Sequence, residues 1–231
     1  MDRAQLEEEV KRRRWFHTFE IAQGLWTSGH YQPDPNWLFG VMELPTDMSG
    51  LRALDMGCAD GIMAFEMARR GAEVTAVDVY TPDFRNVVFL SEVWDLPVRY
   101  VQSTIFEFKD EPFDVVLALG VLYHLQYPLL GLHCLNALCK NTLVLESHVS
   151  RGRSMTCRFY PGKELNDDPS NWWTPTRRCL RAMLESAGFE VTKTLKNAPE
   201  RWMIKAKKVK SVKPAFSHTD VHVANFGFPP Y

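Results

Sequence analysis

The feature that most constrains the fold is a regular alternation of apolar and helical segments that begins at Leu51. Short apolar runs, which we predict to be strands, fall at residues 51–55, 72–78, 97–101, 113–119 and 142–147. Segments with a helical pattern lie between them, near residues 61–70, 83–94 and 129–139. The predicted strands are apolar almost throughout, as expected for strands that are covered on both faces. Alternation at this spacing predicts βαβ units, a mostly parallel sheet and therefore an α/β fold.

The N-terminal segment has a different character. Residues 2–14 predict a charged helix, because three glutamates precede four basic residues in the order that suits the helix dipole. Residues 15–36 are aromatic and irregular. We therefore expect residues 1–50 to form an N-terminal aromatic cap on a domain that covers residues 51–206.

The alternation also breaks after residue 147. Residues 148–175 are predicted to form an insertion over the ligand pocket. Thr174 is the predicted N-cap of a helix that runs to Ala187, and Gly188 is expected to end that helix. The remaining predicted segments are two strands and a C-terminal tail, at residues 189–195, 201–206 and 207–231.

Composition disfavours several classes of protein. The 27 Lys and Arg nearly balance the 28 Asp and Glu, which leaves a net charge of −1 and argues against polyanion binding driven by overall charge. The longest apolar run, from Val115 to Tyr123, is far below the roughly 20 residues that a membrane span needs, and the charged N-terminus predicts no signal peptide. The 5 cysteines contain no C-x-x-C pair, which favours reduced thiols in a cytoplasmic protein without a metal site.

The most informative motif lies between the first predicted strand and the first predicted helix. It consists of an acid, Asp55, followed by small residues at alternate positions, Gly57, Ala59 and Gly61. Small residues let the backbone turn sharply and approach a ligand, and free N–H groups at the helix start favour a polar ligand group. Asp78 follows at the end of the second strand, where an acid can accept both ribose hydroxyls of a nucleoside.

Two cofactors compete for this motif. A dinucleotide requires G-x-G-x-x-G, but the third position here is the bulky Ile62. The carboxylate of Asp55 would also repel a pyrophosphate, whereas it could serve the ammonium of an aminoacyl group. An ordinary strand–turn–helix without a ligand is the remaining alternative.

In this motif the chain resembles the class I S-adenosylmethionine-dependent methyltransferases, over residues 51–206. The resemblance implies a Rossmann-like fold, with a mostly parallel seven-stranded sheet, helices on both faces and an antiparallel last strand. It implies S-adenosyl-L-methionine as the cofactor, with the ribose on Asp78, the adenine edge after the third strand and the sulfonium near the end of the fourth. The implied cofactor-binding residues are Asp55, Gly57, Cys58, Ala59, Gly61, Asp78, Val79, Ser103, Thr104, Ile105, Leu119 and Gly120.

Two further motifs narrow the resemblance. Residues 120–124, with the sequence GVLYH, are similar to a segment of the methyltransferases related to the tRNA wobble-uridine 5-oxyacetic acid enzyme. Residues 15–20 (WFHTFE) and 27–29 (TSG) are similar to the W-Y-H and T-x-G segments of the same group. That tRNA enzyme is longer and has a K-G-P-F-like element that helps it select a carboxylated donor. We find no such element in this sequence.

Tyr123 and His124 are the predicted catalytic residues. They follow the fourth strand, at the edge where open α/β sheets place their ligands. Methyl transfer to a hydroxyl or a protonated amine requires a base, and a histidine with its ordinary pKa near 6.5 suits that role. The alternative for His124 is a structural histidine that caps the loop.

The predicted acceptor-binding residues are indole, imidazole and guanidinium side chains near the expected pocket. They are Trp15, His17, His148, Trp172, Trp173 and Arg178. Each has a structural alternative: an indole can anchor a loop, a histidine can be a plain loop residue, and an arginine can be a solvated helix charge.

These observations predict S-adenosylmethionine-dependent methyl transfer to an oxygen or nitrogen of a small molecule. The alternatives are a tRNA wobble-uridine (carboxy)methyltransferase, with tRNA as the partner, and a non-catalytic nucleoside-binding protein of the same fold. An NAD-dependent oxidoreductase is disfavoured by Ile62.

Overall fold

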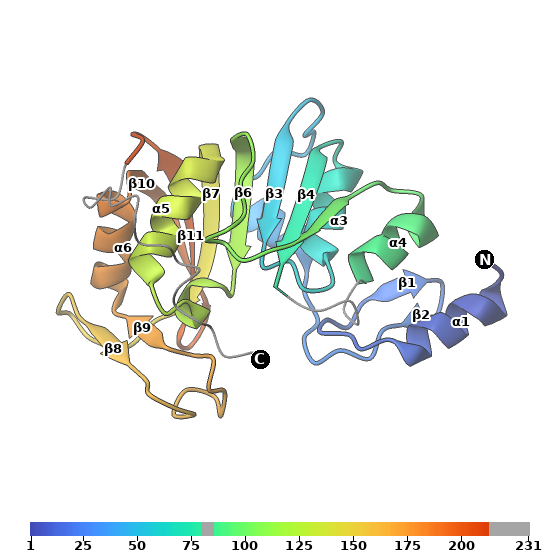
Figure 1. Ribbon diagram of the computed structural model, residues 1–231, viewed down its shortest axis with the longest axis horizontal. Coiled ribbons are helices and arrows are strands. Elements are labelled where there is room, and N and C mark those ends of the chain that lie inside the picture. Colours follow the sequence, from blue (N-terminus) through green and yellow to red (C-terminus); the bar gives the residue numbers. More distant parts are fainter. Residues whose placement is uncertain (80–85, 213–231) are drawn as a thin grey trace.

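The computed structural model describes residues 1–79 and 86–212, and its centre is a seven-stranded sheet in the order β10-β11-β7-β6-β3-β4-β5 (Figure 1). The strands are β3 (Arg52–Met56), β4 (Glu73–Asp78), β5 (Arg99–Gln102), β6 (Phe113–Leu119), β7 (Cys139–His148), β10 (Phe189–Ala198) and β11 (Arg201–Lys208). The strands β3 to β7 pair in parallel, and β11 is antiparallel to both of its neighbours. The predicted α/β fold, with an antiparallel last strand, is confirmed.

Helices cover both faces of this sheet. They are α3 (Ile62–Arg69) and α4 (Asn86–Trp94) on one face, and α5 (Pro128–Leu138) and α6 (Arg177–Ser186) on the other. Side chains of β3 alternate between the two cores, since Ala53 packs on the α3 side and Leu54 on the α5 side. This double coverage is why the central strand β6 is almost entirely apolar. No helix in the described part of the chain is long and apolar enough to cross a membrane.

The predicted helices of this region are confirmed as α3 and α5. In the third, predicted over 83–94, residues 86–94 form α4, and residues 83–85 lie outside the described ranges.

The first fifty residues contain more regular structure than predicted. They form α1 (Arg3–Arg12), β1 (Glu20–Ala22), β2 (Leu25–Trp26) and α2 (Pro35–Val41). The helix α1 confirms the charged helix, with Asp2 and Gln5 in a capping box. The strands β1 and β2 contain only 3 and 2 residues, too few for a periodic pattern. The start of α2 has a readable signal, the N-cap Asp34 followed by Pro35.

An aromatic core attaches this N-terminal segment to α4. The ring centroid of Trp15 lies 5.7 Å from that of Phe19 and 6.3 Å from that of Phe89 on α4. The indole N–H of Trp94, also on α4, donates to the carbonyl oxygen of Ile21 at 2.9 Å. The cap is therefore packed against the sheet domain rather than tethered to it.

One helix boundary was predicted wrongly. Thr174 lies in the short strand β9 (Trp173–Pro175), which pairs with β8 (Cys157–Phe159), and is not an N-cap. The N-cap of α6 is Thr176, whose hydroxyl accepts the N–H of Cys179 at 3.3 Å. Gly188 follows the helix in a left-handed conformation, with φ of 86°, as predicted.

The last two predicted strands are confirmed as β10 and β11, both longer than expected. Of the predicted C-terminal tail, residues 213–231 lie outside the described ranges.

Candidate active site

The candidate site lies at the carboxyl edge of the sheet, where the strand order reverses. The chain leaves β3 toward β4 on one side and later returns to β6 on the other. Open α/β sheets bind ligands at such a switch point. Gly57, directly after β3, has φ of 77°, and a Cβ there would overlap Val121, just beyond β6. Glycine at this position therefore lets the two loops of the switch point touch.

The two predicted cofactor-binding acids are buried beside the turn after β3, Asp55 near the end of β3 and Asp78 at the end of β4. Asp78 accepts the N–H groups of Ala59 at 2.8 Å and Val79 at 2.7 Å. Asp55 accepts the N–H of Ala64, in the first turn of α3, at 3.1 Å. Burial, with a smaller contribution from Asp78, raises the pKa of Asp55 to about 7. We expected Asp55 to serve a ligand's ammonium; its contact in the structure is with the helix start.

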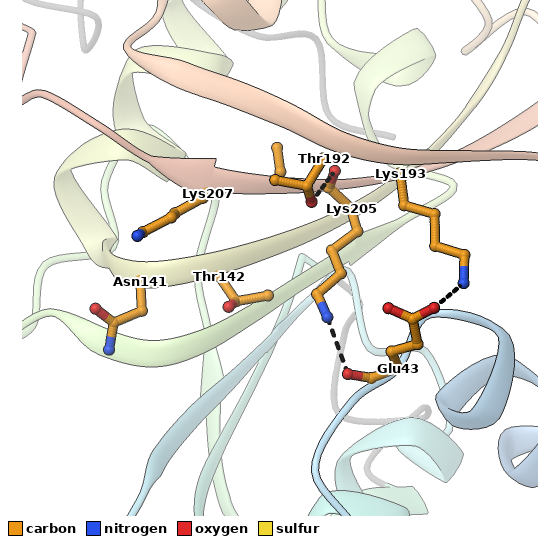
Figure 2. A pocket seen from close by; sticks show the side chains of 8 residues that line it. Glu43, Asn141, Thr142, Thr192, Lys193, Lys205 and Lys207 are labelled. Atoms are coloured by element: carbon orange, nitrogen blue, oxygen red, sulfur yellow. Dashed lines mark hydrogen bonds and ion pairs between the residues drawn. The ribbon is translucent and has the colours of Figure 1, made fainter.

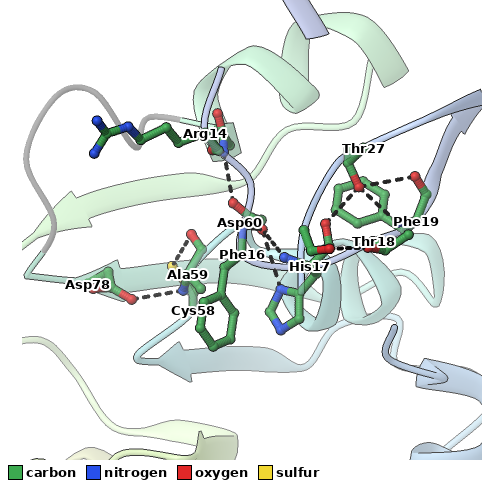
Figure 3. A network of polar contacts seen from close by, with 12 residues as sticks. Arg14, Phe16, His17, Thr18, Phe19, Thr27, Cys58, Ala59, Asp60 and Asp78 are labelled. Carbon is green, nitrogen blue, oxygen red and sulfur yellow. Dashed lines mark hydrogen bonds and ion pairs between the residues drawn. The ribbon is translucent and has the colours of Figure 1, made fainter. Parts of the chain in front are cut away.

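A third acid, Asp60, was not predicted, and it joins the cap to the turn (Figure 3). Its side chain is fully buried. One carboxylate oxygen accepts the N–H groups of Phe16 and His17, both at 2.7 Å, and the other accepts the side-chain amide of Asn86 at 2.8 Å. Asn86 also donates to the carbonyl oxygen of Arg14 at 2.7 Å. The cap backbone is thus bonded directly to the turn.

The T-x-G motif of the cap encloses His17. The hydroxyl of Thr27 donates to the carbonyl oxygen of His17 at 2.6 Å. Gly29 packs against the same peptide, because a Cβ at this position would overlap the His17 backbone. The ring nitrogen Nδ1 of His17 is buried and lies 3.5 Å from the carboxylate of Asp60. His17 therefore faces the glycine turn.

Three buried acids surround the turn, and one of them, Asp55, is ionised only in part near pH 7 because its pKa is about 7. Asp55, Asp60 and Asp78 are buried and lie close to Cys58. Burial and these three carboxylates raise the pKa of the Cys58 thiol, which therefore stays protonated. A cation is attracted to such a turn and an anion is repelled.

The predicted adenine-edge loop follows β5 beside this turn. The N–H of Ser103 donates to the carbonyl oxygen of Asp78 at 2.9 Å. The hydroxyl of Thr104 donates to Glu107 at 2.9 Å. The side chain of Ile105 is buried in the core. Only the backbone of Ile105 is therefore available to a ligand.

Beyond β6, Tyr123 contacts a partly buried ion pair that the sequence did not reveal. It belongs to the 3₁₀ helix η2 (Leu122–His124). Arg201 binds Glu146 through Nε at 2.5 Å and Nη2 at 2.6 Å, and Nη2 also donates to the Tyr123 hydroxyl at 3.1 Å. Burial raises the pKa of Tyr123, and Tyr31 of the cap adds to the shift. The phenol is therefore neutral and fixed in orientation.

His124 lies beside Tyr123, with ring centroids 4.3 Å apart. Its Nδ1 contacts Ser170, at 2.9 Å from the hydroxyl and 3.2 Å from the carbonyl oxygen. Burial lowers the pKa of His124 below its ordinary value. The imidazole is therefore neutral near pH 7 and able to take a proton.

His148, at the end of β7, contacts the same tyrosine from another side. Its ring centroid lies 4.6 Å from that of Tyr123. Its Nε2 lies 3.0 Å from the Asn166 amide nitrogen and 3.2 Å from Nη1 of Arg201. Burial and the charge of Arg201 lower the pKa of His148 to about 4. His148 is therefore a neutral hydrogen-bond acceptor beside the site.

The β8–β9 pair brings the two adjacent tryptophans to this edge. The backbone N–H of Trp172 donates to the carbonyl oxygen of Tyr123 at 2.8 Å, and its ring stacks on Phe159 at 6.3 Å. Trp173 donates its indole N–H to Gln126 at 3.1 Å. Figure 1 shows β1–β2 and β8–β9 beyond the same edge of the sheet, on opposite sides of it.

Two predicted acceptor-binding residues have other surroundings. Trp15 is a core residue of the cap and donates its indole N–H to Val10 at 2.9 Å. Arg178 lines a separate groove beside α6, where it donates to the carbonyl oxygen of Arg153 at 3.0 Å. Neither contacts the residues around Tyr123 within the ranges described.

A cavity of about 650 Å³ lies elsewhere, on the face of β7, β11 and β10 (Figure 2). Its lining includes Thr142 near the start of β7, Lys193, Lys205 and Glu43. Both lysines bond to Glu43. The cavity is near the amino end of β7 and holds no predicted site residue, so we do not assign the ligand to it.

Two groups of curated proteins are similar to this chain in sequence. The chain is 29% identical over 175 residues to the tRNA U34 carboxymethyltransferase of Idiomarina loihiensis, an alignment that covers 72% of this chain and 54% of that protein. It is 38% identical over 131 residues to the ubiquinone biosynthesis O-methyltransferase of Alkalilimnicola ehrlichii, which covers 53% of each protein. The chain thus spans about half the length of the curated relatives it matches.

The fold has solved counterparts as well. The Burkholderia thailandensis 1,6-didemethyltoxoflavin-N1-methyltransferase matches with a TM-score of 0.62 and 21% identity, over 76% of each chain. Residues 34–194 match a family model described as a methyltransferase domain. Because that match covers more than half of this chain, the chain belongs to the methyltransferase domain family.

Proposed function

We propose that the chain transfers a methyl group from S-adenosylmethionine to an oxygen or nitrogen of a small molecule. The observation that carries this proposal is the set of three buried carboxylates, Asp55, Asp60 and Asp78, around the turn at the switch point. S-adenosylmethionine has a sulfonium and an ammonium, which these charges attract. A dinucleotide site needs a small residue where this turn has Ile62, and the acids beside the turn disfavour a pyrophosphate, which together argue against an NAD-dependent reaction.

The residues that would hold the cofactor follow β3, β4, β5 and β6. Asp78 is suited to the ribose hydroxyls, because its carboxylate stands at the end of β4 beside the turn. The backbone of Ser103 and Thr104 is suited to the adenine edge. Gly57 and Gly120, with φ of 77° and 75°, keep the backbone free of side chains where the methionine part would approach. When bound, this cofactor supplies an activated methyl group.

The neutral His124 is suited to the proton transfer that accompanies methylation. A hydroxyl or protonated amine must lose a proton as it gains a methyl group, and a base within reach contributes about 10²- to 10⁴-fold to such reactions. The phenol of Tyr123 has a fixed orientation, because its hydroxyl accepts from Arg201, which is itself held by Glu146. We therefore assign the base to His124 and acceptor alignment to Tyr123.

Aromatic side chains around the edge support a small, flat acceptor. Phe16 and Tyr31 of the cap have ring centroids 5.1 Å apart, and both are substantially exposed, by 40% and 58%. On the opposite side, Phe159 is 49% exposed and stacks on Trp172. Exposed rings on both sides suit an apolar, planar molecule. In this proposal residues 1–50 and 148–175 are the two covers of the pocket.

A second candidate function is modification of the tRNA wobble uridine. It is favoured by the similarity to tRNA U34 carboxymethyltransferases, which extends over 72% of this chain. Overall charge argues against this second function, because an enzyme that binds tRNA needs several phosphate contacts and this chain has a net charge of −1. We propose cytoplasmic action for either function, because all 5 cysteines are free.

A labelled-methyl assay tests the proposal. Purified protein is incubated with S-adenosylmethionine labelled in the methyl group and with panels of phenols, flat nitrogen heterocycles and bulk tRNA. Label in a phenol or heterocycle supports the small-molecule function, and label in tRNA supports the second candidate. In a parallel gel shift at 150 mM salt we expect no complex with bulk tRNA. Cofactor binding with no transfer to any panel favours the non-catalytic alternative.

A further inference from the structure

His124 is held by a chain of hydrogen bonds that starts on a carboxylate of the loop between β8 and β9. Its Nδ1 lies 2.9 Å from the hydroxyl oxygen of Ser170. That hydroxyl donates to Asp168 at 2.6 Å, and the backbone N–H of Ser170 donates to the same carboxylate oxygen at 2.8 Å. The carbonyl oxygen of Ser170 adds a second contact to Nδ1, at 3.2 Å.

These contacts determine which ring nitrogen carries the proton. The hydrogen bonds from Ser170 lower the pKa of Asp168, so Asp168 is ionised and can only accept. The hydroxyl gives its one hydrogen to Asp168 and therefore presents a lone pair to His124. The carbonyl oxygen of Ser170 can also only accept. Both contacts require a hydrogen on Nδ1, and a neutral imidazole has only one such hydrogen, so Nε2 has a lone pair.

The loop that carries this chain of bonds is attached to η2 itself. The N–H of Trp172, two residues after Ser170, donates to the carbonyl oxygen of Tyr123 at 2.8 Å. No polar partner of Nε2 is found among residues 1–79 and 86–212. The loop therefore fixes the orientation of the His124 imidazole and leaves Nε2 available to bond a ligand.

We propose that Asp168 and Ser170 are positioning residues that hold His124 as the Nδ1–H tautomer, with Nε2 as the base. This inference rests on the proposed function, since it supplies the base of that reaction. Nε2 takes the proton that the acceptor oxygen or nitrogen loses as its bond to the methyl carbon forms. The carbon–sulfur bond of the donor breaks in the same step, and its electron pair leaves with the sulfur as S-adenosylhomocysteine. The imidazolium then keeps its hydrogen bond to Ser170, and the negative charge of Asp168 stabilises it through that bond.

Several charged or titratable groups face His124. Asp168 favours its protonated form, whereas Arg201 from β11 and burial favour the neutral form. His148 from β7 and Tyr123 also lie beside it, and both are neutral. Because Asp168 is the one anion in this set, removing its charge lowers the pKa of His124.

The test is ¹⁵N NMR of histidine-labelled protein, followed from pH 5 to 9. The His124 signals are assigned with a His124→Gln variant. In the wild-type protein we expect a single Nδ1–H tautomer at high pH. Asp168→Asn and Ser170→Ala should each lower the pKa of His124 and mix the tautomers. Their double variant should shift the pKa no further than the larger single change, because both residues act through one chain of bonds.

The matched control is Asp167→Asn. It removes the same charge one residue away, from a carboxylate whose nearest cation is Lys163 at 3.8 Å. It should leave the His124 signals unchanged, and Ser170→Thr, which keeps the hydroxyl, should preserve the wild-type tautomer. An Nε2–H tautomer in the wild type, or equal effects of Asp168→Asn and Asp167→Asn, overturns the proposal.

The result for the His124 tautomer can be separated from the result for the proposed function. The NMR signals need no methyl acceptor, and calorimetry with S-adenosylhomocysteine on the same samples reports cofactor binding alone. Binding of the cofactor with the wrong tautomer refutes the positioning role and leaves the function standing. The expected tautomer without cofactor binding refutes the function and leaves the hydrogen-bond chain standing.

Discussion

Asp60 should be the residue on which attachment of the cap to the glycine turn depends most. Its carboxylate accepts three hydrogen bonds inside the protein, from Phe16, His17 and Asn86. Asp60→Asn keeps the size of the side chain but removes its charge. Each of the two backbone hydrogen bonds then has a neutral instead of a charged acceptor, which reduces its contribution to stability by about 1 kcal/mol. The new amide N–H also faces the amide N–H of Asn86, and the loss of that hydrogen bond costs about 1–3 kcal/mol more.

Relief of the repulsion among the three acids of the turn offsets part of this loss. We therefore expect Asp60→Asn to reduce the free energy of unfolding by roughly 3 kcal/mol, a large share of the roughly 5–15 kcal/mol typical of a domain. Urea unfolding followed by tryptophan fluorescence measures the loss. Hydrogen exchange adds local detail, because the amides of Phe16 and His17 should exchange faster than those of the sheet.

The control for this experiment is Asp47→Asn. Asp47 is exposed and its bonds are local, from the hydroxyl of Ser49 and from its N–H at 2.9 Å, so the loss in Asp47→Asn should stay near 1 kcal/mol. If Asp60→Asn unfolds like this control, and the amides of Phe16 and His17 keep their protection, the assignment of Asp60 as the link is refuted.

Three further predictions follow from the site. Asp78→Ala should weaken cofactor binding by roughly 1.5–3 kcal/mol, about 10- to 150-fold in Kd by calorimetry, and an unchanged Kd in a folded variant contradicts the ribose role. His124→Asn should lower turnover about 10²- to 10⁴-fold. The wild-type rate should rise with pH through a pKa below 6.5, because burial lowers the pKa of His124. Near-normal turnover of the variant from pH 6 to 9 would mean that His124 has a structural role only. His148 has a pKa of about 4 in the folded protein and an ordinary value of 6.5. Between these two pH values the unfolded chain binds more protons than the folded one. The free energy of unfolding therefore falls as the pH drops from 6.5 to 4, by up to roughly 3 kcal/mol. Urea unfolding at several pH values should show this slope in the wild type and a flatter one in His148→Gln, and equal slopes count against it.

The sheet could be predicted because its signal is local and repeated. The central strand β6 is buried on both faces, so its apolar run, 113–119, stands out from the amphipathic helices beside it. The turn after β3 was recognisable for a similar reason, since Gly57 and Gly61 occupy left-handed positions that other residues rarely adopt.

What could not be predicted depends on contacts between distant parts of the chain. Asp60 looks like any acid in a glycine-rich turn, and its role comes from amides 43 and 44 residues earlier. Arg201 meets Glu146 because of the register of β11 on β7. A signal was nevertheless present: Glu146 directly follows the apolar run of residues 143–145 inside a predicted strand, and a buried charge requires a partner.

The error at Thr174 has a comparable cause. Thr174 precedes a proline, which favours the first position of a helix, and this local preference pointed to an N-cap. Pairing of β9 with β8 extends the backbone through Pro175, so Thr176 begins the helix instead. Tertiary pairing here overrides a local capping signal.

The most direct test of the central claim is calorimetric titration of the wild-type chain with S-adenosylhomocysteine and, separately, with NAD. We predict binding of S-adenosylhomocysteine with a stoichiometry of one and no binding of NAD, because Ile62 occupies the place of the third glycine of a dinucleotide site and buried acids surround the turn. Binding of NAD, or no heat from S-adenosylhomocysteine with folded protein, would contradict it.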